Sequence, residues 1–285
     1  MIRSGLRCNA QNKTERRDEM NRVGKVSCGV DEPLVSIITP TYNSFEYVAD
    51  TLLSVTSQEY MNWEHIIVDD ASTDATQSVV EALAKRESRI RLIKLPVNSG
   101  AAVARNTAIR AAKGRYIAFL DADDLWLPHK LARQVAFMQE TGAAFTYASF
   151  DLINESGSGI GRVEVPQTAT YSSLLKNNVI GCLTAMYDTK KTGKVEMPLI
   201  RKRQDLGLWL RILKDIPEAH GVSEVLGQYR IRPGSVSSNK LHAAWHTWHL
   251  YRHIEGLPLP QAVYYFVCYA INGVRKGRRN ALVGA

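Results

Sequence analysis

The chain has 285 residues, of which 45% are apolar and 22% charged, and 36 basic against 28 acidic residues give a net charge of +8. These are ordinary values for a globular protein and exclude a disordered, collagen-like or disulfide-framework chain. The four cysteines lie far apart without a C-x-x-C pair, which excludes a zinc knuckle and indicates a reducing compartment.

The chain begins with a polar leader. Residues 1–33 carry no apolar run, so we expect a disordered leader rather than a signal peptide. The most apolar segment near the other end, 262–271, has ten residues, whereas a membrane span needs about 20. We therefore expect a cytoplasmic protein that does not cross the bilayer.

Strands and helices alternate in the first half of the chain, residues 34–150. Apolar runs predict strands at 34–39, 64–68, 90–95, 116–120 and 144–148. Helical spacing separates them, with Ser44 expected to cap the first helix, Ser72 or Thr73 the second, and Gly114 to end the third. This alternation predicts an α/β fold, with a mostly parallel sheet and helices on both faces.

The alternation weakens after Asp151. Residues 151–239 carry glycine-rich turns, short strands and an amphipathic stretch at 206–213, which predict a second half that shapes another part of the site. Residues 240–285 are expected to form a C-terminal helical extension with a basic tail.

Two familiar phosphate-binding loops are missing. The first strand is followed by Pro-Thr-Tyr-Asn rather than G-x-G-x-x-G, which argues against a dinucleotide-binding Rossmann domain. The chain also lacks G-x-x-x-x-G-K-[ST]. It is therefore not a P-loop enzyme.

Carboxylates follow two of the predicted strands. Asp121, Asp123 and Asp124 come directly after the fourth strand, where oxygen ligands would suit Mg²⁺ or Mn²⁺. Asp69 and Asp70 end the second strand. A helix-capping turn is the alternative for both groups, so these residues alone do not decide between the two.

Four ordered motifs together resemble the inverting family 2 glycosyltransferases, whose nucleotide-binding half has the GT-A fold. They occupy residues 35–43, 67–74, 98–106 and 119–124. The resemblance covers roughly residues 34–239. It implies that residues 34–150 bind the nucleotide sugar, and that 151–239 carry the acceptor side and the catalytic base.

The resemblance also assigns roles at the donor side. Asp121 would contact the ribose, and Asp123 would hold the divalent metal, Mn²⁺ or Mg²⁺, on the diphosphate. Asp70 would contact the uracil. The residues expected to line the nucleotide are Pro40, Tyr42, Gly100 and Arg105.

Two segments of the second half carry further expectations. Residues 203–211 resemble the family segment Glu-Asp-x-x-Leu-Trp-x-Arg, with Gln204 in place of the glutamate, and this implies Asp205 as the general base. A helix-capping aspartate is the alternative. Residues 229–237 resemble a loop that closes over the diphosphate, with Arg230 and Ser235 as candidate ligands, or they form an ordinary Pro-Gly turn.

The resemblance implies a metal-dependent inverting glycosyltransferase that moves a sugar from a UDP-sugar to a hydroxyl of a glycan or lipid-linked acceptor in surface polysaccharide synthesis. Two alternatives remain open. A nucleotidyltransferase could share the sheet and acids, although its glycine-rich first loop is absent. A non-catalytic scaffold would bind a sugar nucleotide without needing Asp205.

The basic excess leaves several partners open. It is concentrated at residues 199–214 and 271–285 and is consistent with solubility, phosphate-bearing substrates or anionic lipid. No nucleic-acid-binding motif occurs, so we expect no nucleic-acid partner. Arg275, Lys276, Arg278 and Arg279 follow the apolar segment 262–271, a pattern that fits peripheral contact with the inner face of a membrane.

Overall fold

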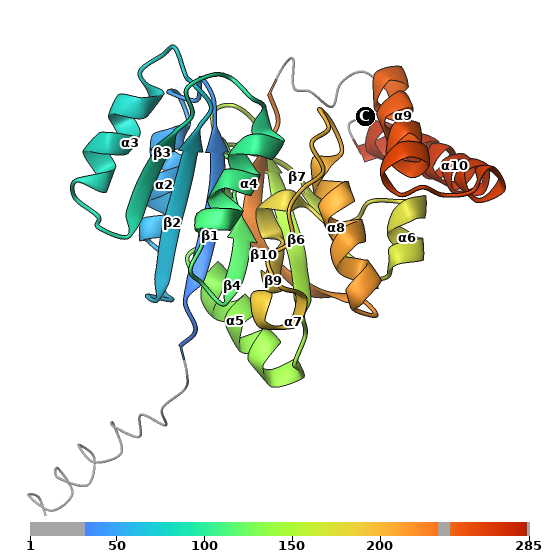
Figure 1. Ribbon diagram of the computed structural model, residues 1–285, viewed down its shortest axis with the longest axis horizontal. Helices are drawn as coiled ribbons and strands as arrows, with labels where there is room; N and C mark the ends of the chain where they lie inside the picture. Colours follow the sequence, from blue (N-terminus) through green and yellow to red (C-terminus); the bar gives the residue numbers. More distant parts are fainter. Residues whose placement is uncertain (1–31, 233–239, 284–285) are drawn as a thin grey trace, which may run out of the picture. The chain divides into compact units, whose positions relative to one another are not determined.

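The computed structural model describes residues 32–232 and 240–283 (Figure 1). The chain divides into two units, residues 1–32 and 33–285, and the second holds all the elements described below. Residues 1–31 of the expected leader lie outside the described residues, as do Ser235 and the rest of 233–239.

One large sheet organises the second unit. Its strands are β1 (Val35–Thr41), β2 (Trp63–Asp69), β3 (Ile90–Lys94), β4 (Tyr116–Phe119), β5 (Leu125–Trp126), β6 (Phe145–Ile153), β7 (Gly159–Val163), β8 (Thr168–Ala169), β9 (Met186–Asp188) and β10 (Ala219–Arg230). The order is β3-β2-β1-β4-β9-β6-β10-β5, with β7 beside β6 and β8 beside β10. Strands β1 to β4 run parallel, β6 pairs parallel with β10, and β9 is antiparallel to both β4 and β6.

Helices cover both faces of this sheet. They are α2 (Val48–Thr56), α3 (Thr76–Ala84), α4 (Ala101–Ala111), α5 (Lys130–Thr141), α6 (Tyr171–Lys176), α7 (Thr189–Thr192), α8 (Gln204–Asp215), α9 (Lys240–His249) and α10 (Leu259–Val283). One core layer packs apolar side chains of α2, α3 and α5 against the sheet. The other layer contains those of α4, α6, α8 and the start of α10. The predicted α/β fold is therefore confirmed.

Helices α2 and α3 begin later than the sequence predicts. Helix α2 begins at Val48, not beside Ser44, whose carbonyl instead accepts hydrogen bonds from the amides of Tyr47 and Val48 at 3.0 and 2.9 Å. Helix α3 begins at Thr76, and its first amide donates to the Asp74 carboxylate at 2.9 Å rather than to Ser72 or Thr73. An extra turn thus precedes each helix.

Gly114 serves a different purpose from the one expected. Helix α4 has already ended at Ala111, and the next residue, Ala112, is extended with ψ 140°. A Cβ on Gly114 would lie 2.6 Å from the amide nitrogen of Ser36 and 2.7 Å from the carbonyl oxygen of Leu34. Gly114 is therefore needed because the backbone of β1 passes so close.

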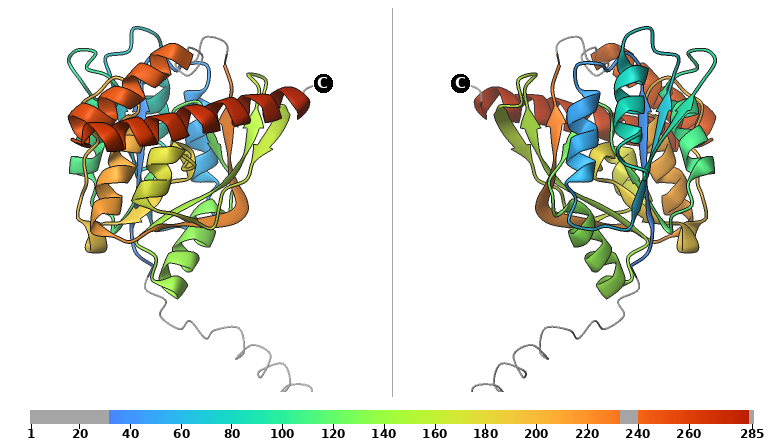
Figure 2. Two further views of the ribbon diagram at one scale, coloured as in Figure 1. Left: turned by 90° about the vertical axis from the view of Figure 1, so that its right-hand side faces the viewer. Right: turned by 90° about the vertical axis from the view of Figure 1, so that its left-hand side faces the viewer.

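The predicted C-terminal helices are present. Helix α10 runs past α6, and the Asn272 amide donates to the carbonyl of Lys176 at 3.1 Å (Figure 2). Within residues 32–232 and 240–283, no helix has both the length and the apolar character that spanning a membrane requires.

Candidate active site

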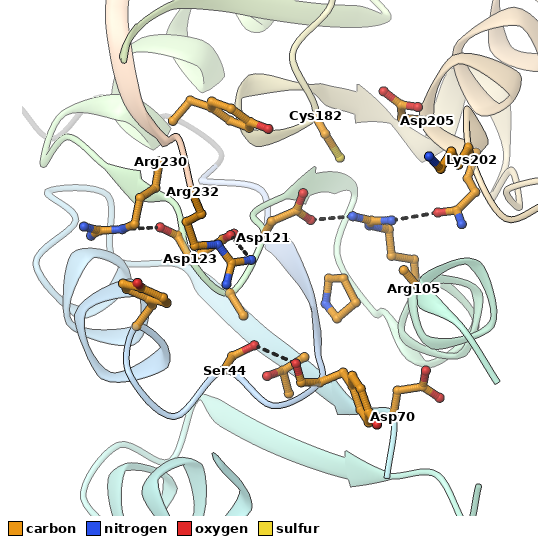
Figure 3. Close-up of a pocket in the computed structure, with 18 of the residues that line it drawn as sticks. Ser44, Asp70, Arg105, Asp121, Asp123, Cys182, Lys202, Asp205, Arg230 and Arg232 are labelled. Carbon is orange, nitrogen blue, oxygen red and sulfur yellow. Dashed lines mark hydrogen bonds and ion pairs between the residues drawn. The ribbon is translucent and has the colours of Figure 1, made fainter. Parts of the chain in front are cut away.

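A cleft of about 800 Å³ opens at the carboxyl ends of β1, β2 and β4 (Figure 3). This is the edge where parallel α/β sheets bind their ligands, because the loops that follow the strands converge there. Loops of both halves of the chain contribute to it. The lining includes Pro40, Tyr42, Tyr47, Asp70, Arg105, Asp121, Asp123, Cys182, Arg201, Lys202, Arg203, Asp205, Tyr229, Arg230 and Arg232.

Three aspartates follow β4 in a turn that enters this cleft. Asp121 and Asp123 line it, whereas Asp124 is buried and accepts a hydrogen bond from the amide of Arg230 at 2.9 Å. Burial, followed by repulsion from Asp121, raises the pKa of the Asp123 carboxyl. Burial and both neighbouring carboxylates raise the pKa of Asp124 well above its usual value. The turn therefore concentrates negative charge that favours a cation.

Arg105 joins the two sides of the cleft. It lies on α4 and bonds the Asp121 carboxylate at 2.5 Å and the Gln204 side-chain oxygen at 3.1 Å (Figure 3). Burial opposes its charge, but the surrounding acidic groups, Asp121 first and then Cys182 and Asp205, together outweigh burial and raise the pKa of Arg105. The guanidinium thus links the acidic turn to the first residue of α8.

Asp70 fixes the loop that leads into α4. Its two carboxylate oxygens accept the amides of Ser99 and Gly100, both at 2.7 Å. Gly100 has φ +92°, a backbone conformation that favours glycine, and precedes the first residue of α4. Asp70 lines the cleft, whereas Gly100, which was expected to line the nucleotide, is not among its lining residues.

Asp205 lies in the first turn of α8, one residue after the helix begins. It is not the N-cap, which is Arg203, and its nearest polar partner is the Asn178 amide at 3.5 Å. Among the described residues, the carboxylate therefore lines the cleft without a short hydrogen bond to another side chain. Such a group is available to a hydroxyl that enters there.

Arg230 and Arg232 close the other side of the acidic turn. Arg230 is buried and donates to the carbonyls of Asp123 at 2.9 Å and Glu155 at 2.7 Å. Arg232 pairs with the Asp123 carboxylate at 2.6 Å. Both guanidinium groups lie over the ring of Tyr47, at 4.9 and 5.3 Å. In this arrangement Arg230 holds the acidic turn in place and Arg232 neutralises it.

The cleft also contains residues that the sequence did not single out. Tyr47 and Tyr229 line it, and the Cys182 thiol lies near Asp121, Arg105 and Asp205. Burial, then the Asp121 charge, raises the pKa of that thiol well above its usual value. Cys182 comes from a 3₁₀ turn whose position in space depends on long-range packing, so no local sequence signal marked it.

Three non-glycine residues with positive φ lie on the loops around the cleft. They are Asn43 (48°), Ala71 (61°) and Arg203 (66°), on the segments after β1, after β2 and before α8. Such backbone conformations are unfavourable for side chains with a Cβ and persist where the surrounding structure imposes them, often at functional sites.

The donor set suits a hard cation. Among residues 32–232 and 240–283, no group of three or more His, Cys, Asp or Glu is arranged to hold a metal on its own. Mg²⁺, however, is commonly bound by one or two carboxylates together with substrate phosphates. The carboxylates of Asp121 and Asp123, which line the cleft, fit a site of that kind.

Comparison with known proteins identifies the class. The model of glycosyl transferase family 2 matches residues 36–191. A Bacillus subtilis (strain 168) protein, provisionally named teichuronic acid biosynthesis glycosyltransferase TuaG, is 47% identical over 246 residues, covering 86% of this chain and 98% of that protein. The Escherichia coli UDP-Glc:alpha-D-GlcNAc-diphosphoundecaprenol beta-1,3-glucosyltransferase WfgD is 39% identical over 248 residues, covering 87% of this chain and 96% of that protein.

The fold agrees with this class. The crystal structure of S. aureus TarS 1-349 in complex with UDP-GlcNAc superposes with a TM-score of 0.66 at 21% identity, covering 83% of this chain and 71% of that one. This likeness shows the GT-A fold. The chain belongs to glycosyl transferase family 2, and the nucleotidyltransferase alternative is set aside.

Proposed function

We propose that this glycosyltransferase moves a sugar from a UDP-sugar to a hydroxyl of a lipid-linked glycan acceptor, with inversion at the anomeric carbon. One observation carries the proposal: a single cleft contains both the acidic turn at Asp121 and Asp123 and, on a different element, the carboxylate of Asp205. One-step inversion requires a leaving-group site and a base that approach the reacting carbon from opposite sides.

The donor side would hold the nucleotide diphosphate. Asp70, Pro40 and Tyr42 line the cleft beyond the acidic turn and would contact the base, while Asp121 would contact the ribose. A divalent ion bound to Asp123 would neutralise charge that develops on the departing diphosphate. Arg232 neutralises the same carboxylate now and would shift towards the phosphates.

Asp205 would accept the proton of the acceptor hydroxyl as that oxygen attacks the anomeric carbon. General-base catalysis typically contributes about 10²–10⁴-fold to the rate. The absence of a short side-chain partner for Asp205 supports this role, because a carboxylate engaged in a tight ion pair would be a weaker base.

The acceptor class follows from the relatives. The name of WfgD specifies UDP-Glc as donor and a sugar diphosphoundecaprenol as acceptor, and that of TuaG specifies teichuronic acid biosynthesis. We therefore propose a lipid-linked acceptor in surface polysaccharide synthesis for this chain as well.

A transfer assay tests the proposal. The protein is incubated with a panel of UDP- and GDP-sugars and a lipid-diphosphate-linked sugar, in Mn²⁺, in Mg²⁺ or in excess chelator. We expect transfer from one UDP-sugar, dependence on the metal, and an inverted anomeric configuration by NMR. Asp123→Asn should lower turnover at least ~100-fold. The control is Asp151→Asn, which should leave turnover unchanged, because Asp151 pairs with Arg162 and is not among the residues that line the cleft. Full activity in chelator would refute metal dependence, and UDP binding without transfer would favour the non-catalytic scaffold.

Helix α10 supports a further part of the proposal, peripheral contact with the inner face of the membrane. Leu259, Val263, Val267 and Ile271 follow one another at four-residue spacing and are about half exposed, from 45 to 55%, so they form an apolar stripe on the side of α10 that faces away from the protein. Basic residues follow at 275–279. An exposed apolar stripe followed by basic residues fits an anionic bilayer.

Vesicle flotation with matched variants tests this contact. Val267→Glu places a carboxylate within the stripe, and Gln261→Glu places one at another exposed position of the same helix. We expect binding to anionic vesicles that weakens with salt and is lost in Val267→Glu but kept in Gln261→Glu. Equal binding by both variants would contradict the proposal.

A further inference from the structure

Three consecutive basic residues lie at the end of the cleft that contains Asp205. Arg201, Lys202 and Arg203 form the segment before α8 and line the cleft. Figure 3 shows Lys202 on the same side as Asp205, away from Asp123 and Arg232. Arg203 adopts φ +66°, so the chain holds this segment in an unfavourable backbone conformation beside the base.

The two arginines of this segment are not neutralised by the aspartates of the acidic turn. Asp121 pairs with Arg105 and Asp123 with Arg232, both at the donor side. In the described part of the chain, neither Arg201 nor Arg203 forms an ion pair with a carboxylate. The Arg203 guanidinium instead donates a hydrogen bond to the neutral hydroxyl of Tyr269. Two arginines that line the cleft are therefore without a carboxylate partner among the described residues.

Helix α10 lies directly behind the segment. The ring of Tyr269 stacks on the Arg203 guanidinium at 5.3 Å, and its hydroxyl accepts a hydrogen bond from the same group. Val263, Val267 and Ile271 lie on the same helix and are exposed. The Asp205 carboxylate, the cationic segment and a helix that carries an exposed apolar stripe thus lie next to one another.

A lipid-linked sugar has groups that match these three features. Its free hydroxyl would meet Asp205, the diphosphate on its anomeric carbon would lie one sugar ring away, and its hydrocarbon would continue from the diphosphate. Arginine suits the middle position, because its planar guanidinium binds phosphate oxygens through two parallel hydrogen bonds.

We infer that Arg201 and Arg203, together with Lys202, form a subsite for the diphosphate of the lipid-linked acceptor. The inference rests on the proposed function and adds the residues that select this acceptor. Tyr269 is a positioning residue in this arrangement, because it holds the Arg203 guanidinium towards the cleft.

Two acceptors that carry the same sugar test whether this segment binds the acceptor diphosphate. One is a lipid diphosphate of that sugar and the other is its alkyl glycoside, which has no phosphate. The quantity measured is the selectivity, the ratio of kcat/KM for the first acceptor to kcat/KM for the second. The main variant is Arg201→Gln, whose side chain is exposed, so folding is preserved. Arg86→Gln, an exposed arginine outside the cleft, is the control.

We expect Arg201→Gln and Arg203→Gln each to lower the selectivity about tenfold or more, the effect of losing a charge-assisted hydrogen bond. Calorimetry should give an unchanged affinity for UDP, and Arg86→Gln should leave the selectivity unchanged. An unchanged selectivity in Arg201→Gln would overturn the subsite while leaving the proposed function intact. Weakened UDP binding would also overturn it, by assigning the segment to the donor. Transfer to neither acceptor by the unsubstituted protein would refute the proposed function and the subsite together.

Discussion

Arg105 is the residue whose removal should most weaken the framework of the site. Its side chain is 11% exposed and that of its partner Asp121 is 29% exposed. Breaking a buried ion pair by removing one partner costs about 3–5 kcal/mol, because the other charge is left uncompensated. Since water still reaches Asp121, we expect Arg105→Met to lower the free energy of unfolding by about 2 kcal/mol.

A second ion pair on the same helix provides the control. Arg110 pairs with Glu196 at 2.9 Å, but the two side chains are 55% and 42% exposed. Exposed pairs contribute about 0–1 kcal/mol, so Arg110→Met should change stability little. Urea unfolding in the absence of ligand measures both variants, with an unchanged m-value showing that the unfolding transition is comparable. In thermal unfolding, the Arg105→Met loss corresponds to roughly 4–8 °C.

The pH dependence of the stability loss in Arg105→Met tests whether the negative charge of the acidic turn causes it. Burial and repulsion from neighbouring carboxylates raise the pKa of Asp123 and Asp124, so acidification removes the negative charge of these two neighbours of Asp121. The loss caused by Arg105→Met should therefore shrink as the pH falls. Equal losses in Arg105→Met and Arg110→Met, or a loss that grows on acidification, would refute the reasoning.

Three further substitutions test the packing beneath the site. Gly114→Ala should destabilise by about 1–3 kcal/mol in urea unfolding, because its Cβ would lie 2.6 Å from the Ser36 amide nitrogen; wild-type stability would refute the close approach. Lys130 is fully buried, its ammonium nitrogen has no hydrogen-bond partner among residues 32–232 and 240–283, and burial lowers its pKa well below the usual value. Lys130→Met should therefore stabilise by about 1–3 kcal/mol, and the gap should widen as the pH falls, because the unfolded lysine binds the proton that the folded one rejects; a gap independent of pH would contradict this. Burial lowers the pKa of His65 to about 3, so the wild-type protein should lose about 2 kcal/mol between pH 7.5 and 5, and parallel pH profiles of wild type and His65→Gln would show that His65 is not the cause.

The edge of the sheet could be predicted because buried parallel strands read as continuous apolar runs. Each run is followed by the polar loop that forms the site, so Asp70, Arg105, Asp121 and Asp123 could be assigned to one edge before any contact was known. The structure brings these four side chains, and Asp205, to one cleft. Their chemical roles remain predictions.

Features that depend on distant contacts could not be predicted. Strand β9 lies between β4 and β6 in the sheet. Arg203 contacts Tyr269, which is 66 positions away in the sequence. No local sequence pattern predicts either contact. Lys130 is the first residue of α5, and its side chain is buried over the ring of Trp126 at 3.7 Å, which no local pattern indicates. Periodicity identifies which face of a helix is apolar, but it does not show what covers a polar neighbour.

The central claim is that Asp205 acts as the base opposite the acidic turn. Asp205 and Asp215 lie near opposite ends of α8, and Asp215 is exposed. The most direct measurement is therefore the rate of sugar transfer by Asp205→Asn and by Asp215→Asn, with UDP affinity measured by calorimetry on the same samples. We predict that Asp205→Asn loses transfer at least ~100-fold while UDP affinity stays unchanged, and that Asp215→Asn retains both. Transfer by Asp205→Asn at the rate of Asp215→Asn, or loss of UDP binding along with transfer, would contradict the account.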